Sequence, residues 1–423
     1  MADVLTSPPL PRNDNHTVRD WRTIPVGELV DHTNLPFVDL DTPVETACQK
    51  LIDHGLASIP IRSSAQDGTI CGTVDYTDLN AFLLLIMGLY QPDEDEDLSS
   101  FEHLAMKARA GGSIPVKLVK DLGKKDPFIT VSESDALSKI VELLGSGVHR
   151  VAVVKEGTST VIGMISQLKL IKYFWEHGRC FPSIEALYSS SLRDLGIGTT
   201  SVVSINGDKR VLDALELMNS EGVSSLAVVD NHLNVVGNIS VADVKYLTRS
   251  SSVPLLKATC FHFLTVILTD RGLHDGKDSY PVFHVNPYSS LAQTVAKLVA
   301  TQSHRMWIVE SPSPASSAPP TPKIAPAVAI PPPGAASPPT TALPSSIPGG
   351  GLGGRLTGVV SLTDILHLFA RSAGLTPTDP NDARSQRRRR SSSSSMRASF
   401  DQSRGSIDLR ELREHRGSFE IRR

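Results

Sequence analysis

One feature limits what this chain of 423 residues can fold into: a short pattern that occurs four times along it. Each copy is an apolar strand that opens on glycine and runs into the start of a helix, where three of the four copies carry an acidic residue. The four copies read Gly72-Thr-Val-Asp-Tyr-Thr-Asp78, Gly163-Met-Ile-Ser-Gln-Leu-Lys169, Gly237-Asn-Ile-Ser-Val-Ala-Asp243 and Gly358-Val-Val-Ser-Leu-Thr-Asp364. Units this small cannot bury an apolar face alone, so the copies are expected to pack on one another.

The residues before each glycine strand extend the pattern. A first short strand precedes it, at 57–61, 149–154, 224–229 and 304–309, and a helix precedes that strand, at 44–53, 136–144, 211–219 and 291–300. Alternating helices and strands of this length predict an α/β fold built from β-α-β-β-α units. The first helix is expected to have Thr42 as its N-cap, followed by Pro43 and by Glu45 in the first turn.

The spacing of the glycines supports four complete units. They are 91, 74 and 121 residues apart, and the last interval falls to 77 when residues 311–354 are set aside. A hairpin loop tolerates such an insert, because the entropy of loop closure grows only logarithmically with loop length. The predicted bounds of the repeats are 21–90, 110–178, 190–250, and 254–310 together with 355–372.

Three segments have compositions that predict disorder. Residues 1–20 are polar and interrupted by proline, and the tail 376–423 is dominated by Arg and Ser. The insert 311–354 is rich in Pro, Ala, Ser and Gly, and 13 of the 29 prolines lie between 311 and 350. Such segments contain too little apolar surface to offset the entropy that the chain loses on folding.

Composition excludes several classes of protein. The formal net charge of −3 argues against a nucleic-acid partner, and the longest apolar runs, Ala81–Tyr90 and Cys260–Leu268, are too short to span a bilayer. The four cysteines form no Cys-x-x-Cys pair, so no metal site is expected. Gly123-Lys124-Lys125 lacks the remaining residues of a phosphate-binding P-loop, and no catalytic motif is present, so no enzyme activity is expected.

These features together resemble the cystathionine-β-synthase-type (CBS) domain, whose repeat has the same β-α-β-β-α order. Four copies paired into two tandem (Bateman) modules are similar to the regulatory gamma subunit of AMP-activated protein kinase. The most specific parts are the His-Arg pairs at 149–150 and 304–305, Gly358–Leu366 and Ser191–Thr199. The resemblance covers residues 21–310 and 355–372.

The Pro-rich insert and the Arg/Ser tail more closely resemble a fungal group of four-CBS proteins, the Sds/Moc type. That resemblance implies a non-enzymatic regulator that inhibits type 2A-like protein phosphatases and acts in cell cycle progression, cell separation and the stress or nutrient response. The resemblance also implies that the protein requires no cofactor and that AMP, ADP or ATP is a possible ligand. A gamma-like kinase subunit that senses the ratio of AMP to ATP stays open as the alternative. A homodimer also stays open, because CBS modules often associate further.

The carboxylates at the helix starts have two interpretations. Each lies three residues after an Asp or Ser, as in Asp75 and Asp78, which is a variant of the capping box. The CBS resemblance implies instead that the carboxylate binds the two hydroxyls of a ribose. The candidate ribose-binding residues are Asp78, Asp243, Asp364, Ser240, Ser361, Thr363 and Thr199. Lys169 replaces the aspartate in the second copy, and an ammonium accepts no hydrogen bond from a ribose.

Two basic pairs, His149-Arg150 and His304-Arg305, begin the first short strand of copies two and four. Solvated basic residues at a strand start are one interpretation. The resemblance implies phosphate binding, for which the guanidinium fork and a protonated imidazole are suited. Copies one and three carry Ala57-Ser58 and Ser224-Ser225 at these positions and supply no cation.

The tail has features of its own. Arg387–Arg390 precede five serines, and Arg-x-Ser occurs three more times, a spacing that suits a basophilic kinase. The candidate phosphorylation sites are Ser392, Ser399, Ser406 and Ser418. Four consecutive arginines are also typical of a nuclear import signal, so a cytoplasmic and nuclear location is expected. The near-neutral net charge divides into +7 for residues 384–423 and −10 for residues 1–383.

Overall fold

The structure is a computed structural model that describes residues 18–31, 35–63, 69–90, 98–248, 252–275, 284–310, 354–382 and 385. The three segments predicted to be disordered lie mostly outside these residues. Their described ends are attached to the folded part. Arg19 forms an ion pair of 3.0 Å with Glu28, and the Thr378 backbone N–H donates to Ser146 Oγ at 2.9 Å.

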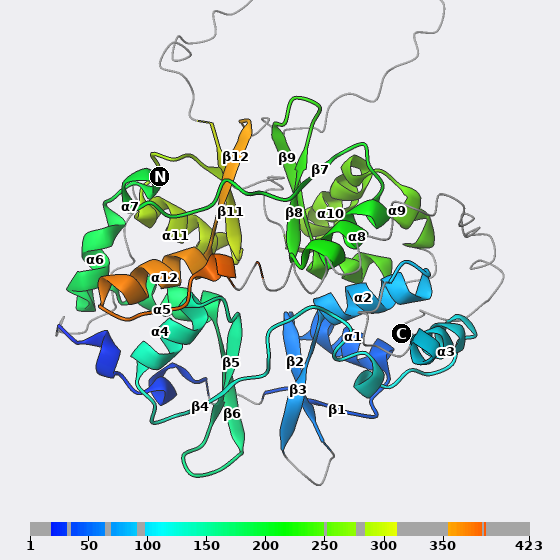
Figure 1. The fold of residues 1–423 in the computed structure, drawn as a ribbon, viewed down its shortest axis with the longest axis horizontal. Helices are drawn as coiled ribbons and strands as arrows, with labels where there is room; N and C mark the ends of the chain where they lie inside the picture. Colours follow the sequence, from blue (N-terminus) through cyan, green and yellow to red (C-terminus); the bar gives the residue numbers. More distant parts are fainter. Residues whose placement is uncertain are drawn as a thin grey trace, which may run out of the picture.

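Four repeats have the predicted order of strand, helix, strand, strand and helix (Figure 1), which confirms the α/β fold and its four CBS-type units. Repeat 1 contains β1 (Val38–Asp39), α1 (Val44–Asp53), β2 (Ser58–Arg62), β3 (Ile70–Asp75) and α2 (Tyr76–Ile86). Repeat 2 contains β4 (Thr130–Ser132), α4 (Leu137–Gly145), β5 (Arg150–Val154), β6 (Val161–Ser166) and α5 (Gln167–Glu176). Repeat 3 contains β7 (Ser204–Asn206), α8 (Val211–Glu221), β8 (Ser225–Val229), β9 (Val235–Ser240) and the 3-10 helix η6 (Val241–Leu247). Repeat 4 contains β10 (His284–Val285), α11 (Leu291–Thr301), β11 (Arg305–Val309), β12 (Leu356–Ser361) and α12 (Leu362–Ser372).

Each repeat forms its own three-stranded sheet. The first and second strands are parallel and the second and third are antiparallel, so the middle strand is paired on both sides. The register places the first residue of each middle strand opposite the N-cap of the last helix. These pairs are Ser58 with Asp75, Arg150 with Ser166, Ser225 with Ser240, and Arg305 with Ser361. The candidate basic and acidic residues therefore lie at the same end of each sheet.

Further helices connect the repeats. They are η2 (Trp21–Thr23), η3 (Val26–Leu29), α3 (Leu98–Arg109), η4 (Val116–Leu118), η5 (Gly178–Cys180), α6 (Pro182–Tyr188), α7 (Leu192–Leu195), α9 (Val253–Lys257) and α10 (Cys260–Asp275). None of the described helices is long and apolar enough to cross a membrane. Within the same described ranges, no group of His, Cys, Asp or Glu side chains is arranged to hold a metal ion.

The segment that leads into each repeat packs on the neighbouring repeat of the same module rather than on its own. Residues 18–31 bind repeat 2, where the Val26 N–H donates to Asp135 O at 2.9 Å. Residues 110–126 bind repeat 1 in the same way, with the Val116 N–H donating to Thr42 O at 2.8 Å. Residues 190–199 bind repeat 4, and residues 252–264 bind repeat 3. We call these four stretches the crossing segments, and they interlock the two repeats of each module.

The crossing segments account for three of the four repeated glycines. A Cβ added at Gly163 would lie 2.6 Å from Val30 Cγ1, and one at Gly237 would lie 2.1 Å from Leu264 Cδ1. A Cβ at Gly358 would lie 2.9 Å from Thr199 O. Contacts this short do not occur between real atoms, so the absence of a side chain at these positions lets the crossing segment lie directly on the strand.

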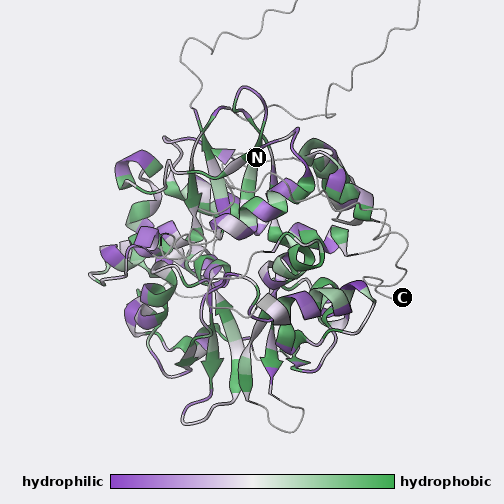
Figure 2. Ribbon diagram, turned by 45° about the vertical axis from the view of Figure 1, so that its right-hand side comes forward, coloured by the Kyte–Doolittle hydropathy of each residue, from purple (hydrophilic) through white to green (hydrophobic). Residues whose placement is uncertain are grey.

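The hydrophobic core is organised across the two modules (Figure 2). One cluster joins repeats 1 and 3, and a second joins repeats 2 and 4. In the second cluster α4 lies against α12, so close that a Cβ on Gly145 would be 3.1 Å from the His367 backbone nitrogen. A smaller cluster, which includes Ala227 and Trp307, joins the sheets of repeats 3 and 4. Each repeat therefore depends on neighbours in both directions.

The start of α1 differs from the prediction that Thr42 is its N-cap. The helix begins at Val44, its N-cap is Pro43, and no side chain caps it. Thr42 Oγ1 instead accepts a hydrogen bond from the Asp39 backbone at 2.9 Å. The Thr42 carbonyl oxygen accepts a hydrogen bond from the Val116 N–H of the crossing segment 110–126, and the Val44 N–H donates to the Ile114 carbonyl oxygen. This long-range pairing takes the place of the local cap.

Candidate functional site

The starts of the middle strands and of the last helices converge at the centre of the molecule (Figure 1). Repeats 1 and 2 approach this centre from one side, and repeats 3 and 4 approach it from the other. The predicted basic pairs and acidic helix caps lie at these element ends. The centre is therefore the candidate ligand site.

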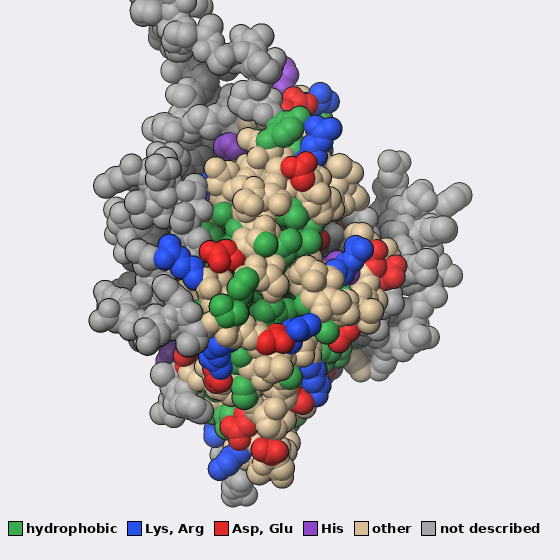
Figure 3. Space-filling model, turned by 90° about the vertical axis from the view of Figure 1, so that its left-hand side faces the viewer, with side chains coloured by type: hydrophobic (Ala, Val, Ile, Leu, Met, Phe, Trp, Pro, Cys, Tyr) green, Lys and Arg blue, Asp and Glu red, His purple; other side chains and the backbone are tan. Residues whose placement is uncertain are grey.

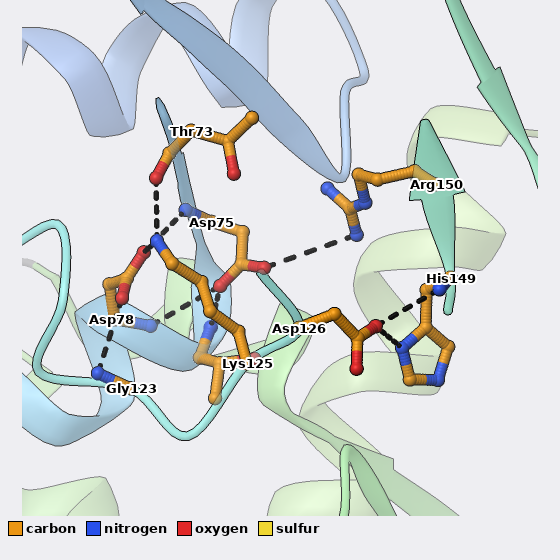
Figure 4. A network of polar contacts seen from close by, with 9 residues as sticks. Thr73, Asp75, Asp78, Gly123, Lys125, Asp126, His149 and Arg150 are labelled. Carbon is orange, nitrogen blue, oxygen red and sulfur yellow. Dashed lines mark hydrogen bonds and ion pairs between the residues drawn. The ribbon is translucent and has the colours of Figure 1, made fainter. Parts of the chain in front are cut away.

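In repeat 1, Asp78 is fully buried and is surrounded by donors (Figure 4). Its Oδ2 accepts hydrogen bonds from the Asp75 backbone at 3.0 Å and from Lys125 Nζ at 2.6 Å. Its Oδ1 accepts from the Gly123 backbone at 3.2 Å. Burial and the neighbouring Asp75 carboxylate raise the pKa of Asp78, while Lys125 acts in the opposite direction. Both carboxylate oxygens are thus bound by groups of the protein itself.

The Asp75 carboxylate also caps α2. Its Oδ1 accepts from the backbone of Thr77 at 2.8 Å, and together with Asp78 it forms the reciprocal capping box that the spacing predicted. Its Oδ2 lies 4.0 Å from an Arg150 guanidinium nitrogen of repeat 2. Arg150 Nη1 is buried and has no hydrogen-bond partner among the described residues. Arg150 therefore crosses from repeat 2 to repeat 1 with part of its donor capacity unused.

His149 is fixed by the linker that leads into repeat 2. Its Nδ1 lies 2.5 Å from Asp126 Oδ2, which also accepts from the His149 backbone at 3.0 Å (Figure 4). These two contacts with one aspartate fix the orientation of the imidazole ring.

Arg305 makes the corresponding crossing in the second module. Its Nη2 donates to Ser224 Oγ at 2.6 Å, and its Nη1 lies 3.4 Å from the Ser225 carbonyl oxygen, both in repeat 3. The two serines occupy the positions that the basic pair occupies in repeats 2 and 4. Small polar residues there allow the arginine of the adjacent repeat to reach across.

His304 lies where the positive charges meet. Part of its surface is accessible to solvent, but the neighbouring protein removes water from much of the imidazole. This loss of hydration is the largest cause that lowers the pKa of His304 to about 4, and the positive charges of His149, Arg305 and Arg150 add to it. His149 and Arg150 of repeat 2 and Arg305 of repeat 4 thus lie close enough to His304 for their charges to act on its imidazole.

The aspartates of repeats 3 and 4 also form capping boxes. Asp243, which is buried, accepts from the Ser240 backbone at 2.8 Å and from Ser240 Oγ at 2.9 Å. Asp364, which is partly exposed, accepts from the Ser361 backbone at 2.8 Å and from Ser361 Oγ at 2.7 Å. The capping interpretation is therefore correct for all three aspartates. It does not conflict with ligand binding, because a carboxylate has about four acceptor positions.

The two threonines among the predicted ribose contacts have partners within the protein. Thr363 is buried, and its hydroxyl accepts a hydrogen bond from Gln167 Nε2 at 2.8 Å in the contact between repeats 2 and 4. Thr199 pairs through its backbone with Val359, and its hydroxyl accepts from the Ser201 backbone at 3.2 Å.

Several polar residues of the centre carried no signal that sequence reasoning recognised. Gly123 and Lys125 belong to the stretch Gly123-Lys124-Lys125, which is no P-loop, and Asp126 follows it directly. Ser224 carries no charge and so gives no sign that it contacts Arg305. The position of Lys125 in the segment that leads into repeat 2 is the one sequence feature that could have pointed to it. The phosphorylation candidates Ser392, Ser399, Ser406 and Ser418 lie outside the described residues.

The fold and this centre define the class: a CBS-domain protein with four repeats in two tandem modules. The CBS domain family model matches residues 26–85, 119–176 and 192–248, and the structure supplies the fourth repeat. A solved archaeal structure from Methanocaldococcus jannaschii, described as a putative archaeal homolog of g-AMPK, has the same fold with a TM-score of 0.54. It is 13% identical, and the match covers 82% of this chain and all of that one.

The relatives in sequence are more specific. Protein sds23 of Sclerotinia sclerotiorum is 52% identical over 96% of this chain and 76% of its own length. Protein sds23 of Aspergillus niger is 53% identical over 93% of this chain and 81% of its own length. The chain belongs to the Sds23 family.

Proposed function

We propose that this protein is a non-enzymatic regulator that inhibits a type 2A-like protein phosphatase and binds an adenine nucleotide at its centre. It would act in cell cycle progression, cell separation and the stress or nutrient response, in the cytoplasm and the nucleus. The phosphatase partner follows from the resemblance to the Sds/Moc group, and membership of the Sds23 family supports it.

The observation that carries the nucleotide part is the meeting of His149, Arg150, His304 and Arg305 at the centre. Like charges this close repel one another, so a cluster of them favours a bound anion. Guanidinium groups bind phosphate through paired hydrogen bonds.

The carboxylates of the second module lie at the same ends of their sheets as this positive centre. In the proposed complex Asp243 and Asp364 would bind the hydroxyls of a ribose, and Ser240 and Ser361 would hold them in place. A ligand with phosphate at one end and a vicinal diol at the other fits both groups, and AMP, ADP and ATP have this chemistry.

Calorimetric titration of the full chain with AMP, ADP and ATP tests this part. Arg305→Ala is expected to weaken binding by about 10- to 100-fold, since a hydrogen bond to a charged group contributes roughly 1.5–3 kcal/mol. Arg355→Ala is the matched control, because its ion pair with Glu310 is 3.7 Å long and exposed. Heat from none of the three nucleotides would contradict the nucleotide part.

The phosphatase part is tested separately. The purified chain is expected to lower the activity of a type 2A-like phosphatase in a dose-dependent manner, and full activity at saturating protein would contradict inhibition. On the face shown in Figure 3, acidic and basic side chains are interspersed with hydrophobic ones. A phosphatase contact on that face would thus depend on shape and on mixed contacts. Co-purification with kinase catalytic and scaffold subunits instead would favour the gamma-like alternative.

A further inference from the structure

We propose that the first module is closed to ligands by its own crossing segments, and that Lys125 fills the carboxylate site of repeat 1. The ribose of a nucleotide would then bind only to the carboxylates of the second module, while its phosphates would still meet the basic residues of both modules at the centre. The closure is a property of the contacts around Asp78 and Lys169, whereas the restriction of the ribose to the second module rests on the proposed function.

The first argument is the occupancy of the Asp78 carboxylate. Lys125 Nζ, the Asp75 N–H and the Gly123 N–H use three of the roughly four acceptor positions of this carboxylate, and a ribose diol needs two. Lys125 Nζ also donates to the Thr73 carbonyl oxygen at 2.5 Å, so one ammonium joins β3 to the start of α2. Only 17% of the Lys125 side chain is exposed, and none of the Asp78 side chain is.

The second argument is the approach of the backbone. A Cβ on Gly123 would lie 2.7 Å from the Asp78 backbone nitrogen and 2.9 Å from the Thr77 carbonyl oxygen. The crossing segment 110–126 therefore lies on the first turn of α2 at a distance that only glycine allows. A ligand cannot enter between these two backbones unless the crossing segment moves away.

The third argument is the matching arrangement in repeat 2. Lys169 occupies the same position of α5 that Asp78 occupies in α2, three residues after the N-cap. Its Nζ lies 2.6 Å from Asp31 Oδ2, which belongs to the crossing segment 18–31. In both repeats of the first module, an ion pair thus ties the crossing segment to the helix start, with the two charges exchanged.

The Asp78–Lys125 pair is the more important of the two. Asp31 is exposed to 73%, so its pair with Lys169 contributes little to stability. The Asp78 charge is buried, and removal of its only described cationic partner leaves that charge uncompensated. Lys125 is therefore the residue on which the closure depends.

Chemical rescue tests the closure without any nucleotide. Lys125→Ala removes three carbons and one ammonium, the atoms that propylammonium contains. The variant is expected to melt on the order of 5 °C below the wild type, and millimolar propylammonium is expected to restore much of that difference in a saturable manner. Lys117→Ala is the control, since Lys117 lies on the same crossing segment and forms an exposed pair of 2.7 Å with Asp41.

Two results of this experiment would overturn the closure. One is a melting temperature for Lys125→Ala equal to that of Lys117→Ala. The other is an equal effect of propylammonium on the wild type and on both variants.

Amide hydrogen exchange of residues 119–126 gives a second measurement that a failure of Lys125→Ala to fold does not affect. Asp78→Asn is expected to speed exchange there at least tenfold, because the amide presents a donor to Lys125. Unchanged exchange would overturn the closure.

Nucleotide titration then separates this inference from the proposed function. Asp78→Asn is expected to keep the wild-type stoichiometry and affinity, while Asp243→Asn loses binding. Loss of one bound nucleotide in Asp78→Asn would overturn the closure. Absence of binding in the wild type would remove the proposed function, and the rescue and exchange experiments would still decide whether Lys125 closes repeat 1.

Discussion

The side-chain amide of Gln167 in repeat 2 donates a hydrogen bond of 2.8 Å to the hydroxyl of Thr363 in repeat 4. The same amide nitrogen lies 2.9 Å from the Leu144 carbonyl oxygen and 3.0 Å from that of Val148. One buried residue thus joins two helices of its own repeat to the opposite module. Asn80 has a similar role between repeats 1 and 3, where its Nδ2 donates to the Leu215 carbonyl oxygen at 3.1 Å.

Gln167→Glu is expected to destabilise the protein by about 3–5 kcal/mol, the usual cost of a buried charge without a partner. The substitution keeps the shape of the side chain but places a carboxylate among three acceptor oxygens. Urea denaturation followed by circular dichroism measures the change. Gln293→Glu is the control, because Gln293 is an exposed residue of a capping box and its substitution should be neutral. Equal stability of the two variants would contradict the role assigned to Gln167.

Gly163→Ala is expected to cost about 1–3 kcal/mol, because the new methyl group would overlap Val30 in the crossing segment. Val30→Ala alone should also destabilise, since Val30 is buried. The double variant is expected to be more stable than the sum of the two effects, because the smaller residue makes room for the methyl. Thermal unfolding of all four proteins measures this, and strict additivity would show that the two residues do not press on each other.

The stability of the protein is expected to fall as the pH decreases from about 6.5 to about 4. In this range the unfolded chain binds a proton at His304 that the folded chain does not bind, because the folded pKa is the lower one. His304→Gln should make this part of the pH dependence weaker, while His262→Gln, an exposed position on α10, should keep it.

A bound phosphate should offset the positive charges around His304 and raise its pKa, so that binding takes up a proton. Proton NMR of the imidazole with and without ATP tests this expectation. An unchanged His304 pKa in the presence of ATP would place the ligand away from His304.

Ser224→Ala is expected to weaken nucleotide binding by a few fold, up to about 10-fold, through the loss of one hydrogen bond. The hydroxyl holds Arg305 at 2.6 Å, so its removal takes one support from the guanidinium without deleting it. The effect should appear in affinity and not in the melting temperature. Ser220→Ala, on the exposed side of α8, is the comparison. The same affinity in both variants would mean that Ser224 does not position Arg305.

Sequence reasoning succeeded where the interaction is local. The aspartates at 78, 243 and 364 lie three residues from their capping partners, and one turn of helix decides that geometry. The insert after β11 was equally predictable, because the two strands around it keep the repeat pattern on either side. Thr42 shows the limit of such reasoning, since a strand pairing from residue 116 replaced its local cap.

The sequence by itself determined that four β-α-β-β-α units exist and, to within one residue, where their middle strands and first helices begin. Hydrophobic periodicity and helix capping depend on residues that lie within about ten positions of one another in the chain. Only the tertiary structure decided which repeats share a core, that the leading segments cross to the neighbouring repeat, and that Lys125 lies on Asp78. The last pair is 47 residues apart, and the Gln167–Thr363 pair is 196 apart. Contacts at such separations depend on how complete units pack, and no local pattern in the chain encodes them.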